Sequence, residues 1–282
     1  MPEHGGHDAA SGENTDLSGL GCGLVGVFIV TLRIPFLSVA MSHAAFAGAV
    51  LGLLAGVSPL ACGIALCVVC AGAVGQTFLL LEPDAGRQAQ AVSLVLDQMD
   101  RFLAKAFEED GACLEGIGYW NYGLLHCVSF GEMLHAKTNG AVDLLAHPKL
   151  KAIAAYPATV AIDRHVFASF ADSHEHSSIA PFIAACLARR TGVESLLTQA
   201  GGMSDWRLTS VLRNLLWWHV PEAGEPVFED AFLPSAGVGK FVWQTGGQRA
   251  VLAAKGGHNG EPHNNNDVGS FVLRIGEATY LC

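Results

Sequence analysis

The sequence predicts a mostly α protein with two or three N-terminal membrane helices, a helical array after them, and the truncated start of an antiparallel β-sandwich. Residues 17–81 contain one formally charged side chain, Arg33. Apolar residues then recur at helical spacing, and after Pro221 the chain changes to short β-type runs between glycines. The overall composition, 51% hydrophobic and 15% charged, averages over these unlike parts.

The predicted membrane segment is residues 17–81. A helix that crosses a bilayer needs about 20 apolar residues. Residues 41–57 and 59–81 approach this length, whereas residues 17–32 are slightly short. Glycine and alanine dominate these runs, as they do where membrane helices pack closely. The leader, residues 1–16, is acidic, unlike a signal peptide, and is expected to be disordered.

One stretch of the apolar region resembles a known family. Residues 23–56 include VGVFIVTLRIPFLSVAMSHAAFAGAVLGLLAG, with Ser42-His43-Ala44 inside it. This is similar to the N-terminal part of the membrane subunit of zinc/manganese ABC importers, over about residues 17–75. The resemblance implies metal transport. His43 is either a metal-pathway ligand or a histidine at a helix end, and we favour the second because one histidine cannot form a metal site.

Residues 82–220 are predicted to form a helical domain. Glu82-Pro83-Asp84 reads as a helix start, and the apolar positions from Val92 to Phe107 follow helical spacing. The predicted helices are 85–107, 119–137, 144–156, 180–190 and 205–219.

Residues 221–282 are predicted to form an incomplete β domain. The expected strands are 239–243, 249–254, 271–275 and 279–281, separated by glycine-rich turns. Four strands are few for a freestanding sandwich.

Charge and cysteine content exclude some functions. The net charge of -10, with no basic cluster, argues against nucleic acid as a partner. The 8 cysteines do not include two CxxC motifs that could together bind a metal, so we interpret them as packing residues.

Two motifs carry candidate chemistry. The first is EGIGYWNYG, residues 115–123, where a turn leads into a helix. The second is KGGHNGEPHNNNDVGSF, residues 255–271, which holds two His, four Asn, one Glu and one Asp in a connection between strands. An Asn/Gly-rich surface turn is the plainer interpretation of the second motif, and core aromatics anchoring a helix that of Tyr119 and Trp120.

Together these motifs resemble the heparinase II/III family of polysaccharide lyases, over roughly residues 82–282. FADS, residues 170–173, and HPKL, residues 147–150, also fit that pattern. The resemblance implies an α-toroid followed by a β-sandwich, and an acidic polysaccharide as partner. It implies cleavage of uronic-acid glycans by β-elimination, in which a proton leaves the carbon beside the carboxylate and the glycosidic oxygen departs.

The resemblance also implies roles for individual residues. Asn121 is the candidate that binds the sugar carboxylate as negative charge develops on it, and His263 is the candidate acid/base. The supporting substrate-binding candidates are Glu115, Tyr119, Tyr122, His258, Asn259 and Glu261.

Two positions depart from the family pattern. Phe170 occupies the region where the family's catalytic tyrosine is expected; Tyr156 is the nearest tyrosine, and no role is assigned to it. Asn265 stands where some relatives have a zinc-binding histidine, so we predict no structural zinc and no cofactor.

The sequence leaves three functional hypotheses. The favoured one is a polysaccharide lyase, either active or inactivated by truncation; the others are a membrane component of a divalent-metal ABC importer and a non-functional fusion of two gene fragments. The predicted location is the cell envelope, at the inner membrane or periplasm. Arg33 suggests a cytoplasmic turn, so two spans place the lyase-like part outside and three place it inside.

Overall fold

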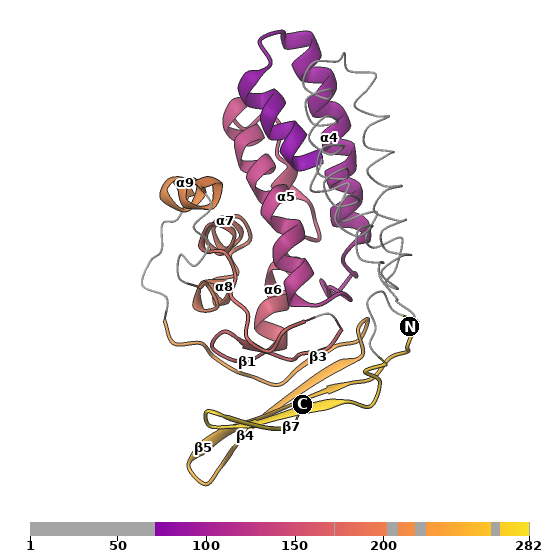
Figure 1. Ribbon diagram of the computed structural model, residues 1–282, viewed down its shortest axis with the longest axis vertical. Helices are drawn as coiled ribbons and strands as arrows, with labels where there is room; N and C mark the ends of the chain where they lie inside the picture. The colour runs from indigo at the N-terminus through magenta and orange to yellow at the C-terminus, as the bar shows by residue number, and fades with distance from the viewer. Residues whose placement is uncertain (1–70, 172, 202–207, 218–223, 261–265, 282) are drawn as a thin grey trace, which may run out of the picture.

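The computed structural model describes residues 71–171, 173–201, 208–217, 224–260 and 266–281. Helices occupy the first part of this range and strands the last. Figure 1 shows the helices in the upper part of the molecule and a sheet that lies across their lower end. The helices are α4 (Ala85–Lys105), α5 (Ile117–Lys137), the 3-10 turn η1 (Leu144–Ala146), α6 (Leu150–Val160), α7 (Pro181–Thr191), α8 (Ser195–Thr198) and α9 (Leu208–Trp217).

The membrane part of the predicted fold class is wrong for the residues that the structure describes. In these residues no helix has both the length and the apolarity needed to cross a bilayer. Residues 17–70, with Arg33 and His43, lie outside the described residues. The predicted span 59–81 is described only from residue 71, and residues 71–81 are helical.

Residues 71–81 instead pack against the helical array. A Cβ atom on Gly72 would lie 2.6 Å from the Cβ of His126 in α5, and one on Gly75 would lie 2.8 Å from Val95 in α4. The amide of Gln88 also donates to the carbonyl of Phe78, at 2.9 Å. Small residues that suggested close packing between membrane helices therefore allow close packing against α4 and α5.

The helix α4 begins and packs as its sequence predicts. The side chain of Asp84 accepts a hydrogen bond from the backbone N–H of Arg87 at 2.8 Å, which caps the first turn. One face is buried, and its residues recur every three or four positions: Ala91, Val95, Met99, Phe102 and Leu103.

The predicted helix 144–156 is interrupted. Pro148 disfavours helical backbone at the residue before it, and His147 has ψ of 132°. The chain therefore forms η1 and then α6, which extends to Val160. A two-stranded antiparallel hairpin that the sequence did not predict follows, formed by β1 (Ala161–Asp163) and β2 (Val166–Phe167).

The C-terminal sheet has five antiparallel strands in chain order. They are β3 (Ala231–Leu233), β4 (Val238–Thr245), β5 (Gln248–Lys255), β6 (Phe271–Ile275) and β7 (Ala278–Leu281). Strand β3 was not predicted. One face carries buried residues such as Val238 and Val251, whereas the other exposes Phe241, Trp243 and Phe271. Side-chain alternation along the strands produces this division.

The sheet is joined to the helical part by charged side chains. Asp163 in β1 accepts hydrogen bonds from Arg249 in β5 at 2.6 Å and from Arg274 in β6 at 3.0 Å. Lys240 in β4 is 3% exposed, and its ammonium donates to the carbonyls of Ala158 and Ala161 at the end of α6.

Candidate functional site

The first motif lies at the N-terminal end of α5. Gly116 precedes the helix with φ of 90°, a conformation that a residue with a Cβ rarely adopts. Trp120 is fully buried, and its indole N–H donates to the carbonyl of Ile153 at 2.9 Å. Tyr119 is partly buried and packs against the same core. Trp120 is therefore a core aromatic, as the plainer interpretation held.

Asn121 has a defined orientation. Its side-chain oxygen accepts a hydrogen bond from the backbone N–H of Ala180 at 3.2 Å, at the start of α7. Because a backbone N–H needs an acceptor, this bond distinguishes the amide oxygen from the amide nitrogen. The contact caps α7, so Asn121 has a structural role whatever else it binds.

The supporting candidates of the first motif differ in exposure. Glu115 is partly buried immediately before Gly116. Tyr122 is 47% exposed, so its phenol is available to a ligand.

The second motif is described in part. His258 and Asn259 are exposed, and Nδ1 of His258 accepts a hydrogen bond from the N–H of Gly260 at 3.2 Å. Glu261 and His263 lie outside the described residues, as does Asn265. The convergence of Asn121 with His263 therefore stays a prediction.

The FADS segment contacts both motifs. The hydroxyl oxygen of Ser173 accepts a hydrogen bond from the N–H of Ile117 at 3.0 Å, which ties the segment to the first turn of α5. The carboxylate of Asp267 accepts one from the N–H of Ala171, which ties the segment to the second motif. Ala171 has φ of 54°. Two motifs far apart in sequence are thus connected through a third segment.

Ser173 and Asp267 were not predicted as functional residues. Each belongs to a motif that was identified, but their partners are 56 and 96 positions away in sequence. The sequence contains no local signal for either contact.

Tyr156 is unsuited to proton transfer. It is buried in the core, and its hydroxyl donates to the carbonyl of Cys113 at 3.1 Å. Burial, with a contribution from the Cys113 thiol, raises the pKa of Tyr156 well above its usual value. Phe170 is buried as well.

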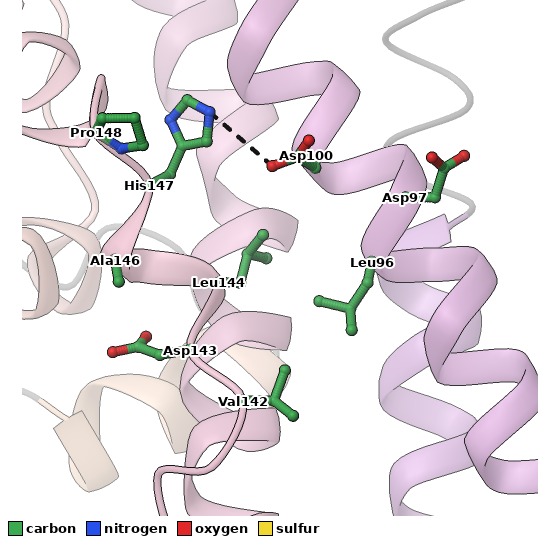
Figure 2. A pocket seen from close by; sticks show the side chains of 9 residues that line it. All are labelled: Leu96, Asp97, Asp100, Val142, Asp143, Leu144, Ala146, His147 and Pro148. Atoms are coloured by element: carbon green, nitrogen blue, oxygen red, sulfur yellow. Dashed lines mark ion pairs between the residues drawn. The ribbon is translucent and has the colours of Figure 1, made fainter.

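The HPKL segment, residues 147–150, contacts α4 through the side chains of His147 and Lys149. The ammonium of Lys149 donates to the carbonyls of Ala104 and Phe107 at 3.0 and 2.6 Å, and so caps the C-terminal end of α4. His147 faces α4, with Nε2 at 4.0 Å from the carboxylate of Asp100 (Figure 2). The pocket between them has a volume of about 440 Å³ and is lined by Leu96, Asp97, Asp100, Val142, Asp143, Leu144, Ala146, His147 and Pro148. These lining residues include none of the predicted site residues.

Buried cysteines agree with a packing role. Cys113, Cys127 and Cys186 are free and buried. Burial raises the pKa of each of these thiols to about 12, so they remain protonated at neutral pH.

Comparison with known proteins supports both predicted resemblances. Residues 14–80 match the model of the ABC 3 transport family. The structure is similar to the crystal structure of heparinase III, with a TM-score of 0.56 and 11% identity over 75% of this chain and 34% of that chain. It is also similar to a heparinase III gene product with methylated lysines, with a TM-score of 0.53 and 14% identity over 87% of this chain and 34% of that chain.

The matched heparinase III structures share the fold of this chain over part of their length. At such identities the likeness concerns the fold, which is that of heparinase III over the matched part. The chain spans about a third of the length of these two solved structures. No curated protein matches the sequence.

Proposed function

We propose that this chain is a polysaccharide lyase that cleaves uronic-acid-containing glycans by β-elimination. The observation that carries the proposal is the connection of the two motifs through residues 171 and 173, by hydrogen bonds to Asp267 and Ile117. Candidate residues from the helical part and the strand part are thereby attached to one segment. The heparinase III fold supports the same reaction class.

In this proposal Asn121 binds the uronate carboxylate. Its oxygen accepts the N–H of Ala180, so its NH₂ group is the part that would donate to a ligand. An amide donor stabilises the carboxylate as enolate-like charge develops during proton removal. The supporting contacts come from Glu115, Tyr119, Tyr122, His258, Asn259 and Glu261.

His263 is the proposed acid/base. A β-elimination needs a base for the proton on the carbon beside the carboxylate, and an acid for the departing glycosidic oxygen. Electrons of the broken C–H bond form the new C=C bond as the C–O bond breaks, which leaves an unsaturated uronate and a free hydroxyl. Tyr156 is excluded because its hydroxyl is held by Cys113 in the core.

The function is tested with the full chain on heparin, heparan sulfate and alginate. The unsaturated product absorbs in the ultraviolet, so activity appears as rising absorbance. No absorbance change with any of the three glycans, from a protein shown by circular dichroism to be folded, would remove the proposal.

The role of Asn121 is tested with Asn121→Asp. A carboxylate still accepts the N–H of Ala180, so α7 remains capped, but the donor is lost and a negative charge faces the uronate. We expect kcat/KM to fall by about 100-fold or more, the loss typical of one oxyanion-stabilising donor. Asn139→Asp makes the same change at an exposed position just after α5 and should leave the rate unchanged. Equal rates in both variants would contradict the assignment.

A second candidate function is metal import, favoured by the match of residues 14–80 to the ABC 3 transport family. The same match supports our inference of a location in the cell envelope. Uptake of zinc and manganese is measured in vesicles that contain the full chain, with and without a partner ATPase. Absence of uptake in both preparations would eliminate this candidate.

A further inference from the structure

The backbone at Ala171 is held in a conformation that its residue type disfavours. Ala171 has φ of 54°, in the left-handed region where a Cβ is sterically penalised. Such residues persist only when surrounding contacts fix them, and they concentrate at functional sites. One such contact is made by Asp267, whose carboxylate accepts the N–H of Ala171 and which is only 8% exposed.

Asp267 is itself fixed to the sheet. The N–H of Ser270 donates to the carbonyl of Asp267 at 2.8 Å. The backbone of Lys255, the last residue of β5, bonds to both Gly269 and Ser270, at 2.8 and 3.0 Å. Asp267 therefore stands at the closed base of the connection between β5 and β6.

On the helical side, Ser173 takes the place of a local helix cap. The first N–H groups of a helix have no partner within the helix, and Gly116 supplies no side chain for capping. Ser173 accepts the N–H of Ile117 instead. A Cβ on Gly116 would lie 1.8 Å from the hydroxyl oxygen of Ser173, so the glycine makes room for this contact.

We propose that Asp267 and Ser173 are positioning residues, which lock the base of the β5–β6 connection to the first turn of α5 through the contacts of residues 171 and 173. Neither residue needs to touch substrate. They act through Ala171 and Ile117 on Asn121, which lies one helical turn after Ile117. The catalytic part of this inference rests on the proposed lyase function.

The experiment compares Asp267→Ala, Asp267→Asn and Ser173→Ala in the full chain. Asn keeps an oxygen acceptor for the N–H of Ala171, whereas Ala does not. The controls are Glu277→Ala and Ser270→Ala, which change exposed side chains in the connections on either side of β6. Hydrogen exchange of the backbone amides of residues 117–121 reports whether the β5–β6 connection stabilises the first turn of α5. The values of kcat and KM report whether catalysis depends on that link.

We expect Asp267→Ala and Ser173→Ala to speed exchange at Ile117 by about tenfold, as loss of a buried hydrogen bond implies. In both variants kcat should fall by about 100-fold with a smaller change in KM, because misplacement of a binding group mainly raises the reaction barrier. Asp267→Asn should restore both quantities to within about threefold of wild type. A purely structural role would not give this pattern of rescue.

The outcomes distinguish failure of the positioning link from failure of the proposed lyase function. If wild type cleaves no glycan, the lyase function fails, and the exchange at Ile117 alone decides whether the link exists. Unchanged exchange in Asp267→Ala and Ser173→Ala overturns the proposal, and so does an Asp267→Asn variant as defective as Asp267→Ala. If Asp267→Ala does not fold, exchange at Ile117 in Ser173→Ala, which lacks only one hydroxyl, decides whether the link exists.

Discussion

Gly116 is a position in the first motif where the backbone and the packing both disfavour a side chain. An alanine there would adopt φ of 90° and place its Cβ against the hydroxyl of Ser173. We expect Gly116→Ala to lower the free energy of unfolding by about 3 kcal/mol, from backbone strain and the lost cap together. Denaturant unfolding of the full chain measures the change.

Gly192 provides the matched control for this prediction. It ends α7 with φ of 74°, but a Cβ there would meet nothing within 4 Å. Gly192→Ala should therefore show the backbone cost alone, about 1 kcal/mol. If both substitutions cost the same, the close approach of Ser173 to Gly116 does not contribute to stability.

At the residue scale, Asn121 itself could be predicted from the sequence, but its hydrogen-bond partner could not. The first motif identified the residue through its resemblance to the heparinase II/III family. Its partner, Ala180, is 59 positions away and was found only in the structure. That partner decides which end of the amide is available to a ligand.

At the scale of elements, Lys149 connects the HPKL segment to α4. Its side chain is 12% exposed, and its ammonium donates to two carbonyls at the C-terminal end of α4. We expect Lys149→Met to lower the free energy of unfolding by about 2 kcal/mol, because it removes a charge that satisfies the helix end and its dipole.

Lys151→Met tests the specificity of that effect. It makes the same chemical change two residues later, at an exposed position in α6. Its effect should stay within about 0.5 kcal/mol, as for other surface substitutions. A similar loss in both variants, measured by denaturant unfolding, would show that the helix end does not depend on Lys149.

Helix and strand positions were mostly predictable because their signals are local. The predicted helix 85–107 is observed as α4, Ala85–Lys105, and the predicted strand 271–275 is observed as β6. The break before Pro148 was missed, although the proline itself carries the signal. The segments β1, β2, β3 and α8 have two to four residues each, too few for a period to appear.

At the scale of the whole molecule, Lys240 couples the sheet to α6 and makes stability depend on pH. Burial lowers the pKa of Lys240 from 10.5 to about 8, although Glu229 and Asp230 oppose the shift. Between these two pH values the unfolded chain binds a proton that the folded chain does not. The free energy of unfolding therefore rises with pH across this window, by up to about 3 kcal/mol from this group.

Unfolding of wild type and Lys240→Met from pH 7 to 10.5 checks this linkage. The variant lacks the titrating group, so its free energy of unfolding should rise less with pH than that of wild type. Lys137→Met, at an exposed position on α5, should retain the wild-type slope. Parallel curves for wild type and Lys240→Met would contradict the assigned pKa.

The sequence by itself determined the order of helices and then strands, the positions of the two motifs and the resemblance to two families. These features depend on residues close together in the chain, so their periodicity and spacing can be read from the sequence. Only the tertiary structure decided that residues 71–81 pack against α4 and α5, that Lys240 joins the sheet to α6, and that Ala171 and Ser173 connect Asp267 to Ile117. Each of these contacts joins residues that are distant in sequence and become neighbours only when the chain folds. The local sequence around each residue therefore carries no signal for its partner.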